Sequence, residues 1–239
     1  VEKYLPEFKN QPGPGGTART RPITVREVMC HSSGMAANPP GEKMEWYYSM
    51  KVTLADAVKA YASVPLAFEP FTRWNYSNMG IATLGRIVEV LSGLKYEDFI
   101  ASRILNPMGM KDSFFFPPAD KKNRIVVNYV TREGKLTPAL HQSLGGDSRE
   151  LRAGATYPAP EFGLFSTAED LSRFYQMMLN GGELQGNRYL SRASVATMTM
   201  VHTSTLQAGH NAGTAFGLTW EVVRDAPGAA ISHRWRGDR

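Results

Sequence analysis

A thiol and an imidazole stand side by side at Cys30-His31, a pairing that could supply a nucleophile and its base. The pair falls at the end of a predicted helix, where adjacent side chains point in different directions. Cys30 is the only cysteine of the chain, which excludes an intrachain disulfide and a thiolate metal cluster. We therefore expect Cys30 to be a buried, small apolar side chain rather than a catalytic group.

The imidazole groups do not form a metal-binding pattern. The five histidines are His31, His141, His202, His210 and His233. None is spaced as in H-x-x-x-H or H-E-x-x-H, the arrangements that place two ligands on one face of a helix. Neither a metal site nor a cofactor is predicted.

Helices are the elements that must position any site in the middle of the chain. Thr24 and Glu27 form a capping box that predicts a short helix, and Ser166 and Glu169 predict a second box. Gly93 is expected to end a helix in the left-handed conformation that glycine favours. The other predicted helices cover residues 53–64, 81–92, 96–105 and 191–200, and residues 36–51 are expected to form a loop.

Strand signals lie mainly near the end of the sequence. One strand is predicted at 216–223 and another at 231–235, with shorter β-like pieces such as 124–129. Helices and strands do not alternate as βαβ units, so the predicted fold class is α+β. We expect one domain over residues 1–239, mostly helical at about 23–200, with sheet strands at about 214–239.

Composition excludes several other classes of protein. The chain is 42% hydrophobic and 21% charged, which is ordinary for a globular domain. Its net charge of +5 comes from scattered cations, without the basic stripe that nucleic-acid binding requires. No apolar run approaches the roughly 18 to 20 residues of a membrane helix. Neither a nucleic-acid partner nor a membrane span is predicted.

Four ordered segments carry more specific patterns. They read ITVREVMCHSSGM at 23–35, FEPFTRWNYSNMG at 68–80, NPMGM at 106–110 and GLFSTAEDL at 163–171. A Tyr-x-Asn triplet alone carries little weight, but four such segments in this order are specific. Together they resemble class C β-lactamases and the related esterases and D-Ala-D-Ala peptidases, a family of penicillin-binding serine hydrolases.

The resemblance implies both a fold and a chemistry. The fold would be of the β-lactamase/transpeptidase type, with a helical region beside an antiparallel sheet. The chemistry would be acyl-enzyme hydrolysis of a small ester, peptide or β-lactam. Tyr76 would be the proton relay or general base, which requires nearby cations because an unperturbed phenol has a pKa of about 10. Asn78 would direct its amide at a lysine and at the substrate carbonyl. A periplasmic or secreted location also follows from the resemblance.

The family's nucleophile is a serine at a helix start, followed one turn later by a lysine. The only Ser-x-x-Lys in the sequence runs from Ser92 to Lys95, at a helix end and after Tyr76, whereas the family's precedes the tyrosine. Ser32 and Ser33 belong to the H-x-S-G turn and are poor candidates. We expect the nucleophile helix to lie upstream of Val1, which would make this chain an inactive fragment by itself.

The end of the sequence departs from the family pattern. His233 aligns with the histidine of a His-x-Gly strand that lines the site in the family, so it is a candidate substrate-binding residue. Trp235 occupies the glycine position, and the residues after it do not form a glycine-rich strand. We expect an unnatural ending after His233 and missing C-terminal strands. Exposed sheet edges would then make the isolated chain marginally stable.

Two functions remain open from the sequence. The first is a serine hydrolase of the β-lactamase-related family. The second is a non-catalytic family member, or a fragment, that binds a ligand or partner. A Ser-x-x-Lys at the start of a helix would favour the enzyme, because one fold can serve many functions and only the site decides among them.

Overall fold

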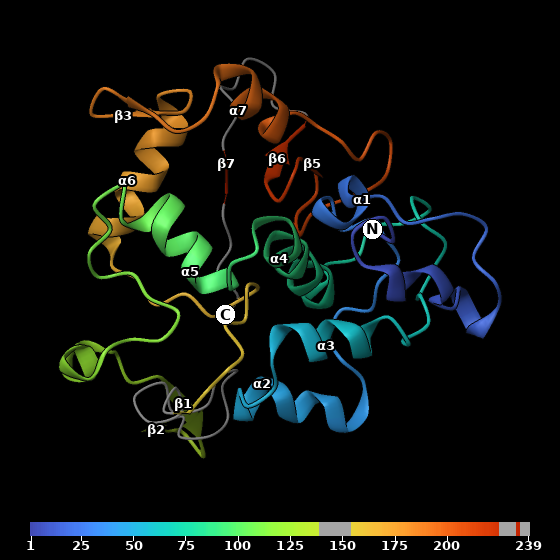
Figure 1. The fold of residues 1–239 in the computed structure, drawn as a ribbon, viewed down its shortest axis with the longest axis horizontal. Coiled ribbons are helices and arrows are strands. Elements are labelled where there is room, and N and C mark those ends of the chain that lie inside the picture. Colours follow the sequence, from blue (N-terminus) through green and yellow to red (C-terminus); the bar gives the residue numbers. More distant parts are fainter. Residues whose placement is uncertain (139–153, 225–232, 235–239) are drawn as a thin grey trace.

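Two hydrophobic clusters lie side by side in the computed structural model, which describes residues 1–138 and 154–224 and the backbone of 233–234 (Figure 1). The first cluster is built mainly by residues up to Ile87, and the second by residues of the segments 100–110 and 171–222. Helices and small antiparallel sheets are combined without βαβ units, which confirms the predicted α+β class.

Helix α4 (Asn78–Ser92) lies at the centre of the first cluster and contacts α1 (Val25–Met29), α3 (Leu54–Tyr61) and α5 (Tyr96–Ile100). The capping box predicted for α1 is present, since Thr24 accepts from the Glu27 amide and the Glu27 side chain accepts from the Thr24 amide. Gly93 ends α4 with φ +71°, as predicted. Local capping signals therefore place the ends of these helices correctly.

The segment 36–51 is not the loop that the sequence predicted. It contains the 3-10 helix η3 (Gly41–Met44) and helix α2 (Glu45–Ser49), which ends at Met50 with φ +56°. Tyr47 and Met50 are fully buried in the first cluster. Packing of these two side chains against the core explains a helix that has no side-chain cap. The other short helices are η1 (Pro6–Asn10), η2 (Pro14–Gly16) and η5 (Ala119–Arg124).

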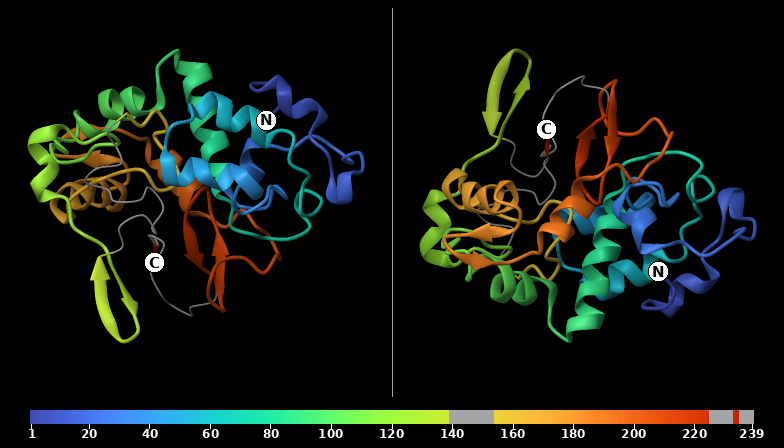
Figure 2. Two further views of the ribbon diagram at one scale, coloured as in Figure 1. Left: turned by 90° about the horizontal axis from the view of Figure 1, so that it is seen from below. Right: turned by 90° about the horizontal axis from the view of Figure 1, so that it is seen from above.

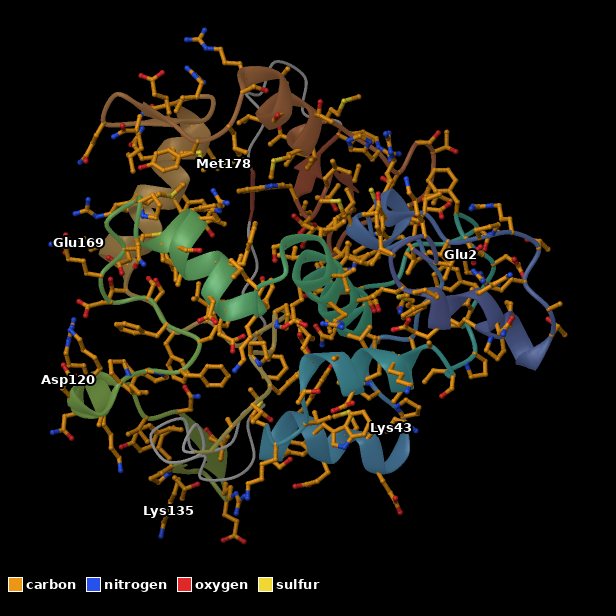
Figure 3. All side chains as sticks on the ribbon, viewed as in Figure 1. Glu2, Lys43, Asp120, Lys135, Glu169 and Met178 are labelled. Atoms are coloured by element: carbon orange, nitrogen blue, oxygen red, sulfur yellow. The ribbon has the colours of Figure 1, made fainter. Side chains whose placement is uncertain are left out.

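The second cluster joins α5, α6 (Ala168–Leu179), α7 (Arg192–Thr199) and the hairpin of β3 (Glu183–Leu184) and β4 (Asn187–Arg188). The predicted helix 96–105 is present, but its second half, Ala101–Leu105, is a π-helix. Four methionines contribute to this core, and Figure 3 shows Met178 on α6, whereas Lys43, Asp120 and Lys135 lie at the rim of the molecule. Thioether side chains fill irregular gaps between short helices well.

The capping box predicted at Ser166 and Glu169 is shifted by one residue. Thr167 is the N-cap of α6, and its Oγ1 accepts from the Asp170 amide at 3.1 Å. Ser166 Oγ instead lies 2.7 Å from Ser113 Oγ, and the Asp170 carboxylate accepts from that same Ser113 hydroxyl at 2.8 Å. A tertiary contact therefore decides which of two adjacent hydroxyl residues caps the helix.

Strand β6 (Glu221–Val223) is the middle of a three-stranded antiparallel sheet, between β5 (Thr214–Phe216) and β7 (His233–Arg234). The predicted strand at 216–223 is thus two strands joined by a turn, in which Thr219 has φ +65°. Thr219 is not a residue type that favours this conformation, and the strand prediction passed over Gly217, the turn residue two positions before it. The strand predicted at 231–235 is represented by β7 within the described residues.

A second hairpin, β1 (Tyr129–Arg132) with β2 (Lys135–Pro138), projects from the body of the protein (Figure 2). The predicted β-like piece at 124–129 is wrong for most of its length, because Arg124 ends η5 and the first strand begins only at Tyr129. Among the described helices, none combines the length and apolar character that a membrane crossing needs.

Candidate active site

Two segments far apart in sequence are joined into one scaffold beneath Tyr76 and Asn78. Four backbone hydrogen bonds link residues 31–37 to residues 67–78. They run from Ala67 N to Gly34 O (2.7 Å), Phe71 N to Ser32 O (2.7 Å), Asn75 N to His31 O (2.9 Å) and Asn78 N to Ala37 O (2.8 Å). The H-x-S-G segment is therefore the template on which the Tyr-Ser-Asn segment lies.

Gly34 makes this close approach possible. Its backbone has φ +84°, which side chains rarely tolerate. A Cβ atom at this position would overlap the carbonyl oxygen of Phe68. The glycine of the H-x-S-G segment therefore has a structural requirement of its own, since any larger residue would separate the two segments.

Ser77 connects the scaffold to helix α4. It is the N-cap of that helix, and its Oγ accepts from the Gly80 amide at 3.0 Å and donates to the Ala36 carbonyl at 2.7 Å. Its own amide donates to Nδ1 of His31 at 3.1 Å. Tyr76 thus immediately precedes the N-cap, and Asn78 is the first residue of α4, whereas the sequence predicted a helix that begins only at residue 81.

Asn78 is buried, with 7% of its surface exposed. Its Nδ2 donates to Oδ1 of Asn38 at 2.8 Å, and its Oδ1 has no hydrogen-bond partner among the residues that the structure describes. A buried carbonyl oxygen without a donor carries a free-energy penalty of about 1–3 kcal/mol. Such an atom in a native protein is a natural place for a donor from a ligand or another segment.

Tyr76 is half-buried in a cluster of aromatic rings. Its ring centroid lies 4.4 Å from that of His31 and 5.7 Å from that of His210. Trp74 packs edge-on against His210 at 5.3 Å, and Phe216 of β5 lies edge-on to His31 at 5.1 Å. The cluster places Tyr76 between the helical region and the three-stranded sheet.

His233 lies on the same sheet as Phe216. Its backbone in β7 is paired with Val222 of β6, whose neighbour β5 carries Phe216. Its side chain is outside the described part of the chain, as are His141 and Trp235. The substrate-binding role of His233 and the catalytic roles of Tyr76 and Asn78 therefore stay predictions.

His31 is the site residue that sequence reasoning missed. Only 3% of its surface is exposed, and burial, together with the nearby His210, lowers its pKa to about 3. The H-x-S-G pattern marked its position as part of a turn, but no local signal showed that its ring meets Tyr76. The adjacent Cys30 is buried as predicted, and burial raises its pKa to about 11, which disfavours the reactive thiolate.

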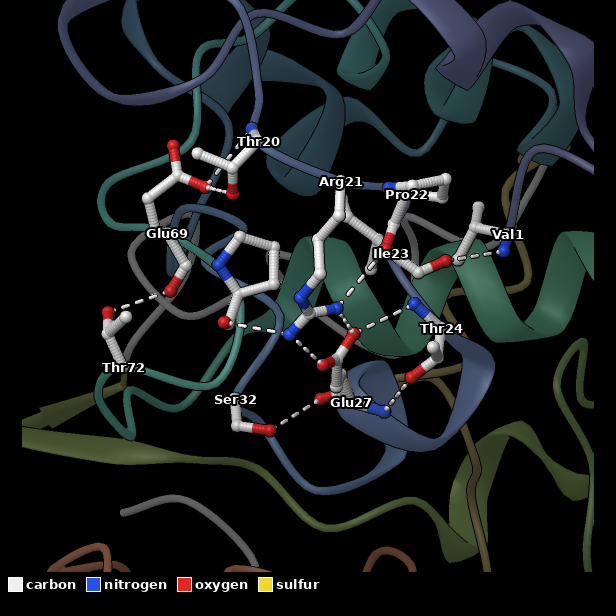
Figure 4. Close-up of polar contacts among 11 residues, drawn as sticks. Val1, Thr20, Arg21, Pro22, Ile23, Thr24, Glu27, Ser32, Glu69 and Thr72 are labelled. Carbon is white, nitrogen blue, oxygen red and sulfur yellow. Dashed lines mark hydrogen bonds and ion pairs between the residues drawn. The ribbon is translucent and has the colours of Figure 1, made fainter.

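An ion pair secures the start of this scaffold (Figure 4). Both guanidinium amino groups of Arg21 bind the Glu27 carboxylate, at 2.5 and 3.1 Å, and one of them also donates to the Pro70 carbonyl at 2.9 Å. Burial opposes ionisation of Glu27, but hydrogen bonds from Arg21 and Thr24 outweigh it and hold its pKa below the usual value. Helix α1 is thereby tied to the loop that leads to Tyr76.

The three serines considered from the sequence lie at a helix end and in a buried turn. Ser92 is the last residue of α4, and its Oγ accepts from the Leu94 amide at 3.2 Å. Ser32 and Ser33 are buried in the turn beneath Tyr76.

In the described ranges, no group of three or more histidine, cysteine, aspartate or glutamate side chains is arranged as metal ligands would be.

Comparisons with known proteins give a consistent result. A family model described as Beta-lactamase matches residues 1–235. An uncharacterized protein of Mycobacterium tuberculosis is 28% identical over 251 residues, which cover 91% of this chain and 57% of that protein. The chain thus spans little more than half the length of this curated relative.

Solved structures share the fold. EstCE1, a hydrolase with promiscuous acyltransferase activity, superposes with a TM-score of 0.69 at 22% identity, over 94% of this chain and 61% of that one. A beta-lactamase/D-alanine carboxypeptidase from Pseudomonas syringae superposes with a TM-score of 0.61 at 19% identity, over 93% of this chain and 52% of that one. At these identities the likeness shows a common fold.

Proposed function

This chain belongs to the Beta-lactamase family, and we propose that it forms the proton-transfer side of a serine hydrolase site. The observation that carries the proposal is the buried Oδ1 of Asn78, two residues after the half-buried Tyr76, for which the described residues provide no donor. An ammonium group bound there would satisfy Asn78 and supply the positive charge that Tyr76 needs to accept a proton.

The proposed reaction is acyl transfer in two steps. Tyr76 accepts the proton of a serine hydroxyl while the serine oxygen attacks the substrate carbonyl. The tetrahedral intermediate then collapses, and the leaving group departs with that proton. Tyr76 then takes a proton from water, and the water oxygen attacks the acyl-enzyme. As the ester bond to the serine breaks, Tyr76 returns this proton to the serine oxygen, which releases the acid and the free serine. In this scheme Asn78 orients the ammonium group, and His233 contributes to substrate binding.

The proposed substrates are small esters, D-alanine peptides or β-lactams. Support comes from the names of the structural neighbours, which include a hydrolase with acyltransferase activity and a D-alanine carboxypeptidase. The geometry of Tyr76 and Asn78 is compatible with all three, because each presents a carbonyl carbon to the same nucleophile.

A non-catalytic role is the second candidate. It is favoured by the position of the only Ser-x-x-Lys, since Ser92 ends a helix and therefore has no helix N-terminus to favour an oxyanion. In that case the aromatic cluster around Tyr76 would contribute to binding a ligand without turnover. The two candidates differ in one observable, the formation of a covalent acyl-enzyme.

Covalent labelling tests the proposal. The 239-residue chain and the longest reading frame that contains it are incubated with a fluorescent penicillin and with a chromogenic ester. We expect the longer protein to be labelled and to turn over the ester, and the chain alone to do neither. Tyr76→Phe should lower turnover by about 10²- to 10⁴-fold, the usual contribution of a general base.

Tyr129→Phe is the matched control, because Tyr129 lies exposed on the β1–β2 hairpin and should leave the rate unchanged. Full activity in the Tyr76→Phe protein would refute the proposed role of Tyr76. A label attached to Ser92 would overturn the assignment of the nucleophile. A longer protein that is folded but takes no label from either reagent would favour the non-catalytic role.

A further inference from the structure

We propose that His31 is a positioning residue, which holds the peptide segment 75–77, and with it the Tyr76 ring, in the orientation that proton transfer requires. The consequence for turnover rests on the proposed function. The positioning itself rests on three different contacts that the buried His31 makes with residues 75–77. These residues lie more than forty positions away from His31 in the sequence.

Each of the three residues is held by a different part of His31. The carbonyl oxygen accepts from the Asn75 amide at 2.9 Å. The imidazole lies against the Tyr76 ring, with a centroid distance of 4.4 Å and an interplanar angle of 34°. Nδ1 accepts from the Ser77 amide at 3.1 Å. Together these contacts leave the peptide planes on both sides of Tyr76 little freedom to rotate.

The backbone of His31 is itself constrained. Its φ of +57° lies in the left-handed region, where a residue with a side chain is uncommon. Its amide donates to the Val28 carbonyl at 3.2 Å, at the end of α1. Such a conformation has a free-energy cost and persists only where surrounding contacts determine it, and sites of this kind are concentrated near functional groups.

The Nδ1 contact also explains why an imidazole is useful here. The first amides of a helix have no partner within the helix. Around the start of α4, the Ser77 amide is satisfied by His31, the Asn78 amide by the Ala37 carbonyl and the Gly80 amide by the Ser77 hydroxyl. A phenylalanine would fill the same space but would leave the Ser77 amide buried without an acceptor.

The same contact argues against His31 as an acid or base. Because Nδ1 accepts a hydrogen bond, the proton of the neutral ring lies on Nε2. The aromatic rings of Trp74, Tyr76 and Phe216 surround the His31 ring. Burial, and after it the nearby His210, disfavour the protonated form of His31. A ring that stays neutral across the physiological range can orient Tyr76 but cannot exchange protons with it.

Two variants separate the hydrogen bond from the bulk of the ring. His31→Phe keeps an aromatic ring but removes the acceptor. His31→Asn removes the ring but keeps an acceptor near the Nδ1 position, and asparagine tolerates the left-handed backbone. His202→Asn is the control, because His202 lies outside the cluster and its ring contacts Thr197 and Arg26.

The readouts are the nitrogen-15 spectrum of the imidazole and the hydrogen exchange of the Ser77 amide, both measured on this chain from pH 5 to 8. We expect Nδ1 to be unprotonated and Nε2 protonated throughout. Ser77 exchange should accelerate about tenfold in His31→Phe, as for the loss of one hydrogen bond. The Ser77 exchange rates of His31→Asn and of the control should stay within about threefold of the rate in the original protein, a smaller change than the loss of one hydrogen bond would cause.

A proton on Nδ1 would overturn the proposal, as would equal exchange rates in the two His31 variants. These measurements need no turnover, so they separate this inference from the proposed function. In the longer protein, His31→Phe should lower kcat about tenfold with little change in KM, and His31→Asn should restore most of it. If no acyl-enzyme forms at all, the function fails while the positioning result still holds.

Discussion

At the scale of single residues, the Glu27 carboxylate is the best-anchored charge of the scaffold. It accepts from both amino groups of Arg21 and from the Thr24 amide, and one Arg21 group continues to the Pro70 carbonyl. Charge-assisted hydrogen bonds of this bidentate kind are about twice as strong as neutral ones. The pair therefore stabilises both α1 and the loop before Tyr76.

Glu27→Gln should destabilise the protein by about 2 kcal/mol at neutral pH, because charge-assisted hydrogen bonds become neutral ones. The pKa of Glu27 is lower in the folded protein than in the unfolded chain. The stabilisation that ionised Glu27 provides is therefore fully present above the unfolded-state pKa of about 4.3 and is lost as the pH falls through the folded-state pKa. Urea denaturation between pH 3 and 7 measures the difference.

Glu169→Gln is the control for that series. Glu169 pairs with Arg173 at 3.4 Å, but 80% of its side chain is exposed. Solvent screens such a pair, so the substitution should change stability by less than about 0.5 kcal/mol. A Glu27→Gln protein that is destabilised equally at pH 3 and pH 7 would contradict the ionic interpretation.

At the scale of elements, the start of α4 is the junction on which the site depends. Ser77 caps the helix and also reaches across to the Ala36 carbonyl, so one hydroxyl holds the helix and the H-x-S-G segment together. Tyr76 and Asn78 flank this residue. A change at Ser77 should therefore act on the helix and on both candidate site residues at once.

Ser77→Ala should lower the free energy of unfolding by about 2 kcal/mol, the upper end for an N-cap, because the buried Ala36 contact is lost as well. Ser191→Ala, at the exposed N-cap of α7, loses its bond to the Ser194 amide and a solvent-exposed contact with the Ser194 hydroxyl, and should cost about 1 kcal/mol. Thermal melts of the two proteins make the comparison. Equal losses would show that the Ala36 bond adds nothing.

At the scale of the whole molecule, the turn between β5 and β6 connects the two hydrophobic clusters. The Thr219 amide donates to the carbonyl of Met29 in α1, and the Leu218 amide donates to the carbonyl of Met198 in α7, each at 2.9 Å. The sequence predicted exposed sheet edges, and the edge at β5 is partly covered. The Phe216 carbonyl accepts from the His202 amide, and the Phe216 amide donates to the Thr203 hydroxyl. We therefore expect the two clusters to unfold together.

Met177→Ala tests this coupling. Met177 is fully buried in the second cluster, and its truncation should lower stability by about 2–5 kcal/mol. If the clusters are coupled, tryptophan fluorescence, which Trp46 reports from the first cluster and Trp220 from the second, should follow one transition with the same lower denaturant midpoint as helical circular dichroism. Met200→Ala, at an exposed position, should leave the midpoint within the error. Two separate transitions would refute a single cooperative unit.

The success of the sequence predictions depended on how local each signal was. The capping box at Thr24 and Glu27 and the end at Gly93 involve residues within one helical turn, and both are confirmed. The box at Ser166 was wrong by one residue because Ser113, 53 positions away, binds that hydroxyl. The strand at 216–223 was wrong because the prediction followed the β-favouring residues around Gly217 and passed over this glycine as a turn signal.

The sequence by itself determined the family and the α+β class, since these follow from motif order and from the arrangement of predicted elements, but it began the helix after Tyr76 and Asn78 three residues too late. Only the tertiary structure decided what surrounds them. The contacts of Tyr76 with His31 and of Asn78 with Asn38 close loops of about forty residues. Such contacts depend on the path of the whole chain, and no local pattern encodes that path.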